Sequence, residues 1–465
     1  MSTPIDSKQI WKMDKDHFIH PYTDFSSFNK EGSQIITQAE GAYVSDSEGN
    51  RYLDGIAGLW CVNIGHGRRE MADAMSEQVM QMGYYNPFGH CTNEPASRLA
   101  AKLAELAPGN LNHVFYGCGG SVANDTAIRL VHFYNNLRGK PQKKKIISRV
   151  DGYHGSTYLA ASLTGIHATK NSFDCMDTLI DFVSAANMYR RPAGAEELSE
   201  EAYCDFLVDE FENRILQLGA DNVAAFIAEP IMGAGGVLVA PEGYHQRMHA
   251  ICKKYDMLFI SDEVVTAFGR LGRMFASEDL YGFTPDIICI AKGLTSGYIP
   301  LGATLLSDDI YQVISQPQCE GGVLSHGFTY SGHPVACAAA LKNIEIMERE
   351  RVCEQVQELG PYFQKRLAEL MDLPIVGDVR GSHFMAGIEL VRNKTTKEGF
   401  SATDGSAMRV FKRCLNRGLV IRPIGNLIVV SPPLILSKEQ CDQIVDTLQA
   451  SIEETAAELK VAGLV

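Results

Sequence analysis

The sequence predicts an α/β protein with a mostly parallel sheet, followed by a separate α+β region towards the C-terminus. Its 465 residues are enough for two or three domains. Short apolar segments alternate with helical patterns through the middle of the chain, which is typical of a parallel sheet with helices on both faces. The pattern changes after about residue 335, where two long helical segments precede several short strand-like ones.

The elements expected from these patterns follow one another without an internal repeat. A polar arm with aromatic residues runs to about residue 35, and a hairpin is expected over residues 42–54. The strands expected in the sheet are 114–116, 145–150, 224–228, 258–261, 287–291 and 303–306, with a helix over 121–138. The C-terminal region is expected to contain helices over 334–350 and 355–371, strand-like pieces at 379–390, 420–422 and 427–431, and a last helix from residue 438.

Composition excludes several classes of protein. The net charge of -14 argues against a broad nucleic-acid surface, which needs clustered Lys and Arg. The run Lys143–Lys145 opens an apolar segment and is expected to be a solvated strand entry. No segment approaches the ~20 apolar residues of a membrane span, and the N-terminus has no apolar signal core. Twelve cysteines without a CxxC pair or a His/Cys cluster predict free thiols in a reducing cytoplasm and no metal site.

Lys292 is the most informative single residue. It ends the apolar strand segment 287–291 and is followed by a stretch rich in glycine. Desolvation at the mouth of a buried strand would lower the pKa of its amine and make it nucleophilic, as a Schiff-base lysine requires. The alternative, a lysine whose ammonium reaches water from a strand end, is the commoner situation.

Other polar groups follow the ends of the expected strands. The loop Gly117–Ser121 joins a strand to a helix, so Gly120 and Ser121 can form a phosphate cup, although a glycine turn with a serine cap explains the same residues. Asp262 at a buried strand end can pair with a protonated pyridine nitrogen or serve as a structural cap. In a parallel sheet, the carboxyl ends of the strands meet at one edge, where ligands bind.

Three further residues have both a functional and a structural interpretation. Tyr153 follows a strand end and can stack on a planar ring or pack in the core. Glu229 is another acid at a strand end. Arg422 lies on an apolar strand, where a guanidinium suits a carboxylate clamp or, more commonly, a structural ion pair.

Taken together, these residues stand in blocks that resemble one family. From Tyr43 to about Pro433 the chain resembles class III (subgroup II) aminotransferases, which have fold type I of the pyridoxal-5′-phosphate (PLP) enzymes, and most closely the ω-amino acid and amine:pyruvate transaminases. The blocks that carry the resemblance are YLDGIAGLWCVNIGHG, GGSVANDTAIR, DGYHGST, AEPIMGAGGV, ISDEVVTAFGRLGRMF, PDIICIAKGLTSGYIPLGA, HGFTYSGHPVACAAAL and VIRPIGNLIVVSPP.

The resemblance implies a seven-stranded, mostly parallel sheet in a large domain and a smaller α+β domain built from both chain ends. The implied division is an arm and part of the small domain over 1–65, the PLP domain over 66–333 and the remaining small domain over 334–465. It also implies an obligatory homodimer with shared active sites, either on its own or as half of a dimer of dimers. The partners implied are small amines and keto acids, with no nucleic acid and no membrane.

The resemblance also assigns roles to residues. Lys292 would hold PLP as a Schiff base and move the proton at Cα, while Asp262 would pair with the pyridinium nitrogen. The other cofactor-binding residues would be Gly120 and Ser121 at the phosphate, Tyr153 and Val264 on the two ring faces, Glu229 on the ring-oxygen side, and Thr329 at the phosphate of the neighbouring subunit's cofactor. The substrate would meet Trp60, Phe88, Tyr153 and Arg422, the last of which would bind the carboxylate of pyruvate or alanine.

The implied reaction is a ping-pong transfer of an amino group from an ω-amino acid or primary amine to pyruvate. One departure from the family pattern is Val122, where a glutamate is common. It leaves the amino donor open, together with a taurine:pyruvate reaction and 2-oxoglutarate as acceptor. An aminomutase, a decarboxylase and a PLP-fold protein without catalysis are the remaining alternatives.

Overall fold

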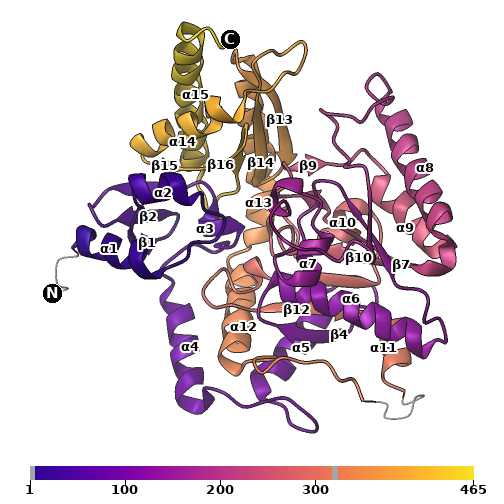
Figure 1. Cartoon of the computed structure of the whole chain (residues 1–465). Helices are drawn as coiled ribbons and strands as arrows, with labels where there is room; N and C mark the ends of the chain where they lie inside the picture. The colour runs from indigo at the N-terminus through magenta and orange to yellow at the C-terminus, as the bar shows by residue number, and fades with distance from the viewer. Residues whose placement is uncertain (1–5, 317–322) are drawn as a thin grey trace.

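The core of the large domain is a seven-stranded sheet. The computed structural model describes residues 6–316 and 323–465 (Figure 1). Within these, the strand order is β4-β12-β11-β10-β7-β5-β6, and β12 alone runs antiparallel to its neighbours. The strands are β4 (His113–Gly117), β5 (Lys145–Arg149), β6 (Ile180–Val183), β7 (Val223–Ala228), β10 (Leu258–Asp262), β11 (Ile287–Ile290) and β12 (Gly302–Leu306). The predicted mostly parallel α/β fold is confirmed.

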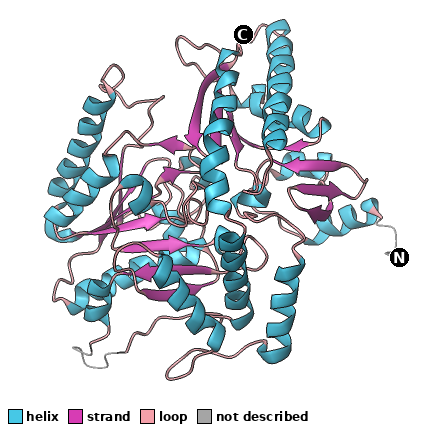
Figure 2. Cartoon of the chain, turned by 180° about the vertical axis from the view of Figure 1, so that it is seen from behind, coloured by secondary structure: helices cyan, strands magenta, loops and turns pink. Residues whose placement is uncertain are grey.

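Helices cover both faces of this sheet because its strands are apolar on both sides. Neighbouring residues of one strand, Ile146 and Ile147 of β5, belong to different apolar clusters on opposite faces. Helices α8 (Glu200–Leu218) and α9 (Tyr244–Lys254) pack on the side of Ile147, and α6 (Gly120–Leu137) packs on the side of Ile146. Figure 2 shows the sheet between these helical layers. Every residue of β7, β10 and β11 is buried.

The small domain joins the two ends of the chain. Strands β1 (Ile36–Glu40), β2 (Tyr43–Asp46) and β3 (Arg51–Asp54) continue into β15 (Leu419–Val420), which pairs in parallel with β3. A second sheet has the order β13-β14-β17-β16, with β13 (Val376–Ser382), β14 (Met385–Leu390), β16 (Arg422–Ile424) and β17 (Leu427–Val430). Helices α14 (Ser406–Asn416) and α15 (Lys438–Val461) complete it. The expected α+β domain from both chain ends is confirmed, whereas its boundaries at 65 and 333 stay predictions.

The remaining long helices bridge the two domains. Helices α4 (Arg69–Met82), α5 (Glu94–Leu106), α12 (Pro334–Arg349) and α13 (Val352–Ala368) contribute to one large apolar core that also includes small-domain residues. The N-terminal arm forms two short helices, α1 (Ser7–His17) and α2 (Phe25–Glu31), which lie beside the small domain in Figure 1. In the described ranges, no helix is long and apolar enough to span a membrane.

Three expectations need correction or an addition. Strand β6 has no counterpart among the expected strands, because its Ile-Asp-Phe-Val sequence is short and follows an irregular stretch. Lys143 is not solvated: it is 2% exposed, and its ammonium donates to the carbonyls of Ala220 and Tyr255. Ala220 follows the C-terminus of α8 and Tyr255 is the C-cap of α9, so the lysine bonds carbonyls beside two helix ends. Cys319 lies outside the described residues, and the described cysteines are unpaired as expected.

Arg270 ties the large domain to both chain ends. It is fully buried, and its guanidinium donates to the carbonyls of Phe384 (3.0 Å) and Pro432 and to Oδ1 of Asn63 (3.0 Å). A buried guanidinium needs such acceptors, and buried carbonyls lose their partners if it is removed.

Replacing this arginine should therefore destabilise the fold. We expect Arg270→Ala to lower the free energy of unfolding by about 3 kcal/mol, since several charged hydrogen bonds are lost in the interior. The midpoint of urea-induced unfolding, followed by circular dichroism, measures the effect. Arg69→Ala is the matched control, because the Arg69 side chain is 87% exposed. Equal midpoints for the two variants would contradict this role.

Candidate active site

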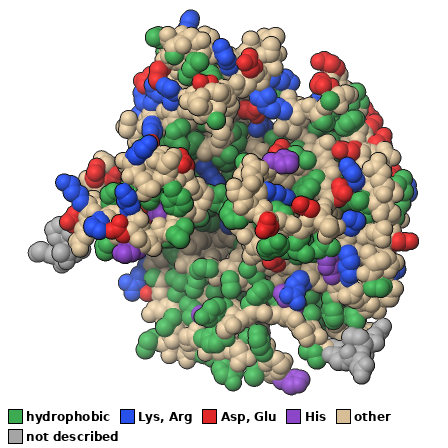
Figure 3. All heavy atoms as spheres, viewed as in Figure 1, with side chains coloured by type: hydrophobic (Ala, Val, Ile, Leu, Met, Phe, Trp, Pro, Cys, Tyr) green, Lys and Arg blue, Asp and Glu red, His purple; other side chains and the backbone are tan. Residues whose placement is uncertain are grey.

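A cavity of about 390 Å³ lies at the carboxyl edge of the large sheet. All the predicted site residues except Phe88 and Thr329 line it: Trp60, Gly120, Ser121, Tyr153, Glu229, Asp262, Val264, Lys292 and Arg422. The face shown in Figure 3 is hollowed between the N-terminal elements and the large domain, with apolar side chains around the recess. The sheet thus gathers residues that are far apart in the sequence, as its topology predicts.

Asp262 ends β10 inside this cavity and is 4% exposed. Its Oδ2 accepts hydrogen bonds from Nδ2 of Asn124 (2.8 Å) and pairs with Nδ1 of His154 (2.8 Å). Its Oδ1 accepts from the backbone N–H of Val264 (3.1 Å). These contacts stabilise a carboxylate away from water. The Oδ1 of Asn124 is buried in the cavity wall without a partner among the described residues.

Lys292 follows β11 on the same edge, with a left-handed backbone (φ 46°) that is uncommon for a lysine. Burial lowers the pKa of its amine, and the carboxylates of Asp262 and Glu229 offset part of that shift. Within the described residues, its Nζ forms no hydrogen bond or ion pair. The side chain therefore presents a desolvated amine to the cavity.

Glu229 follows β7 and supports the neighbouring loops. Its Oε1 accepts from the backbone N–H of Tyr153 (2.9 Å), and its Oε2 accepts from that of Gly233 (2.8 Å). Burial raises the pKa of its carboxyl group. Burial also raises the pKa of Tyr153 to about 12, so this phenol stays neutral and can donate a hydrogen bond.

The N-terminus of α6 forms an open anion site. In the described structure it has no side-chain cap and no acidic residue in its first turn, and its first residues, Gly120 and Ser121, line the cavity. A Cβ at Gly119 would meet nothing within 4 Å, whereas one at Gly155 would lie 2.4 Å from Oγ of Ser121. The glycines therefore allow the backbone and Ser121 to approach an anion closely.

The outer part of the cavity is aromatic and contains one half-buried cation. Arg422 lies on β16, and no carboxylate pairs with its guanidinium in the described part of the chain. Burial lowers the pKa of this group. Tyr22 from the N-terminal arm also lines the cavity, and its hydroxyl hydrogen-bonds to those of Ser156 (2.9 Å) and Tyr153 (3.3 Å).

The sequence patterns do not indicate that Tyr22 and Asn124 belong to this site, and they place His154 beside Tyr153 at a strand end without a role of its own. A motif-based search could have found His154, which follows Tyr153 directly, and Asn124, which lies one helical turn after Ser121. Tyr22 could not be found, because the arm has no periodic pattern that fixes its position. Val122 does not line the cavity. Residues 190–201, whose sequence RRPAGAEELSEE is typical of an exposed loop, do not line it either: Ala195 is buried and Arg190 pairs with Glu389.

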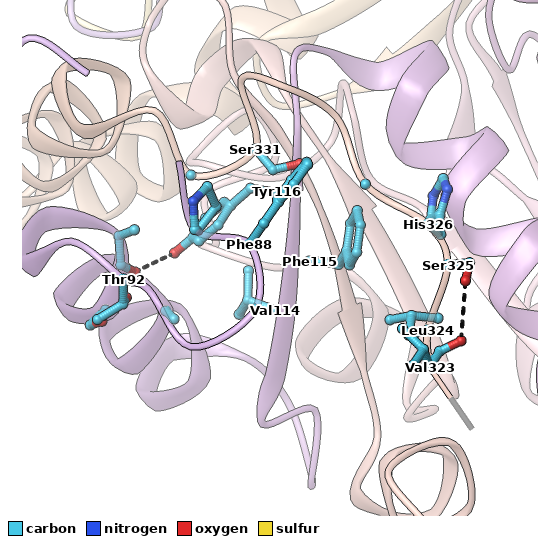
Figure 4. A pocket seen from close by; sticks show the side chains of 17 residues that line it. Phe88, Thr92, Val114, Phe115, Tyr116, Val323, Leu324, Ser325, His326 and Ser331 are labelled. Atoms are coloured by element: carbon cyan, nitrogen blue, oxygen red, sulfur yellow. Dashed lines mark hydrogen bonds between the residues drawn. The ribbon is translucent and has the colours of Figure 1, made fainter. Parts of the chain in front are cut away.

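Phe88 and Thr329 lie outside this cavity. Phe88 lines a second cavity of about 720 Å³, and Figure 4 shows it beside Tyr116, with Phe115 and His326 further along the wall. Thr329 is exposed, and its carbonyl accepts from the hydroxyl of Tyr84 (2.6 Å). Neither residue reaches the Lys292 cavity of its own chain, so their predicted roles require a second copy.

Comparison with known proteins now decides the family. The class III aminotransferase model matches residues 27–452. The chain is a class III aminotransferase. It is 44% identical to a putrescine–pyruvate aminotransferase of Pseudomonas aeruginosa, over 96% of each chain, and 40% identical to a diaminobutyrate–2-oxoglutarate transaminase of Halomonas elongata, over 95% of this chain and 94% of the other.

Solved structures of this family superpose on the whole chain. An (S)-enantioselective omega-transaminase from Thermomicrobium roseum has a TM-score of 0.93 and 40% identity, covering 97% of this chain and 99% of its own. An omega-transaminase from Pseudomonas jessenii in complex with PMP has a TM-score of 0.94 and 37% identity, over 97% and 99%. The predicted PLP fold type I is confirmed.

Class III aminotransferases depend on PLP. The residues that line the cavity of this chain fit that cofactor. A phosphate matches the uncapped N-terminus of α6 with Ser121, and a protonated ring nitrogen matches the buried Asp262 carboxylate. The unpaired amine of Lys292 lies in the same cavity.

The fit at the phosphate end can be tested through Gly155. We expect Gly155→Ala to release PLP on dialysis at least about tenfold more readily, because the new methyl group would displace Ser121. Absorbance of the retained cofactor measures this release. Gly139→Ala is a matched control, since Gly139 also has a positive φ (71°) but a Cβ there would meet nothing within 4 Å. Equal retention in both variants would contradict the placement of the phosphate.

Proposed function

We propose that this enzyme moves the amino group of a primary amine or ω-amino acid to pyruvate, giving alanine, in two half-reactions at one site. The observation that carries the proposal is the cavity itself, where an unpaired buried amine, a buried carboxylate and one free guanidinium face a common space. Similarity to a putrescine–pyruvate aminotransferase supports it.

Each residue has a defined task in this proposal. When bound, PLP supplies an electron-withdrawing ring that stabilises negative charge at the Cα of the amine. Lys292 would attach the cofactor and then, as a free amine, would take the proton from Cα. Asp262 keeps a proton on the ring nitrogen, and His154 and Asn124 fix the orientation of its carboxylate. Tyr153 and Val264 would hold the two faces of the ring, and Glu229 would support its oxygen side.

The number of cationic side chains in the cavity indicates which keto acid is the amino acceptor. Among its described lining residues, only Lys292 and Arg422 are cationic, and Lys292 is needed for chemistry. Arg422 can bind one carboxylate in a bidentate way. Pyruvate has one carboxylate, whereas 2-oxoglutarate would bring a second one without a matching cation. Pyruvate is therefore the better acceptor. The second candidate is 2-oxoglutarate, which appears in the name of the Halomonas relative.

A homodimer completes this site in our proposal. Phe88 and Thr329 lie on an apolar, exposed part of the surface together with Tyr84, Val323 and Tyr330. A second copy seated there would bring Phe88 to the substrate side and Thr329 to the phosphate of its neighbour. A cytoplasmic location fits the unpaired thiols of the described cysteines.

The attachment of the cofactor is tested at Lys292. We expect Lys292→Ala to lower kcat by at least about 10³-fold, because both the covalent link and the base are lost. Borohydride reduction of the wild-type holoenzyme should fix PLP to the peptide that contains Lys292, as read by mass spectrometry. Lys140→Ala, at a partly exposed lysine that lies outside the cavity, is the control. Label on any other lysine would refute the assignment.

The role of Arg422 is tested by separating the half-reactions. We expect Arg422→Ala to raise the KM for pyruvate about 100-fold, the loss expected for a charge-assisted bidentate pair. The half-reaction with 1-phenylethylamine, which has no carboxylate, should change by less than about threefold. Stopped-flow absorbance measures each half-reaction. A similar loss in both would show that Arg422 supports the fold and does not bind the acceptor.

A further inference from the structure

The turn that carries Trp60 into the cavity has an unusual backbone. In the four-residue element α3 (Ala57–Trp60), Ala57, Gly58 and Trp60 all have a positive φ, of 50°, 64° and 64°. Alanine and tryptophan rarely adopt this left-handed conformation, so surrounding contacts have to stabilise it. Strain of this kind gathers at functional sites, where it fixes the direction of a side chain.

The side chain of Asp54 provides those contacts. Its Oδ1 accepts from the backbone N–H of Ile56 (3.1 Å), and its Oδ2 accepts from that of Gly58 (2.7 Å). Nε2 of His66 lies 3.2 Å from the same Oδ2. Asp54 is 2% exposed, so water does not compete for the carboxylate.

The two residues that the turn presents form one wall of the cavity. Trp60 is 3% exposed and packs in an apolar cluster with Met385 and Val429 of the small domain, while Leu59 lines the outer cavity. The indole therefore fills space that a substrate side chain would otherwise enter. A rotation of the turn would move both side chains together, because the two residues are adjacent.

We propose that Asp54, assisted by His66, is a positioning residue that holds the turn over residues 57–60 and thereby sets which amines fit the cavity. Asp54 touches neither substrate nor cofactor and acts only through Trp60 and Leu59. The inference rests on the proposed function in one respect, since it treats this cavity as the amine site. The holding of the turn itself does not depend on the reaction.

The experiment uses the holoenzyme and measures two quantities, the fluorescence quenching of Trp60 and the preference between two amines. Trp60 and Trp11 are the two tryptophans of the chain, so in a Trp11→Phe background the emission reports on Trp60 alone. Asp54→Asn leaves one side-chain oxygen for two backbone N–H groups, which should loosen the turn. We expect stronger acrylamide quenching of Trp60. We also expect at least about a tenfold change in the ratio of kcat/KM for 1-phenylethylamine to that for n-butylamine, the effect of altering a hydrophobic pocket wall.

Asp46→Asn is the matched control, because Asp46 also holds a turn, through the backbone N–H groups of Glu48 (3.0 Å) and Asn50 (2.9 Å), and lies outside the cavity. It should change neither reading. Equal results for the two variants would overturn the proposal, as would increased quenching with an unchanged ratio. If Asp54→Asn does not fold, His66→Ala is read in the same way: smaller shifts in the same direction support the proposal, and none overturns it.

The transaminase function and the role of Asp54 in holding the turn can be disproved independently. If the wild-type enzyme transferred no amino group from any amine, the proposed function would fall. The quenching of Trp60 would still show whether Asp54 holds the turn.

Discussion

The buried carboxylate of Asp262 is the interaction on which the rest of the site depends. A charge that is 4% exposed is costly unless it is hydrogen-bonded, and here the donors come from three separate segments: Val264 N–H, Asn124 on α6 and His154 after β5. The same arrangement fixes α6, whose uncapped N-terminus forms the anion site, relative to β10. The Asp262 carboxylate and the anion site would hold the two ends of one cofactor, and Lys292, which follows the neighbouring strand β11, would meet its reactive atom.

Most of the fold could be predicted because its signals are local. Buried strands such as β7, β10 and β11 are continuous apolar runs, and the helices between them have regular apolar spacing. Strand β6 could not be predicted, because a four-residue edge strand with a central aspartate has no distinctive pattern. The burial of Lys143 was missed for a different reason: the carbonyls that it satisfies belong to helix ends more than 70 residues away in the sequence.

The centre of the site was also predictable, whereas its rim was not. Lys292, Asp262, Glu229 and Tyr153 follow strands whose order places their ends at one edge, so the topology alone brings them together. Tyr22 enters from an arm whose path no local pattern sets, and the left-handed turn at Trp60 depends on Asp54, which precedes it by a few residues only. Sequence similarity pointed to Trp60 but could not show what holds it.

We infer that the enzyme transfers the amino group in two separable half-reactions. A single-turnover experiment is the decisive test: the holoenzyme is mixed with 1-phenylethylamine in the absence of a keto acid, and pyruvate is added afterwards. We expect one ketone per site and loss of the visible cofactor absorbance in the first step, then recovery of that absorbance with one alanine per site in the second. Release of ammonia in the first step, with the cofactor absorbance unchanged, would contradict this mechanism.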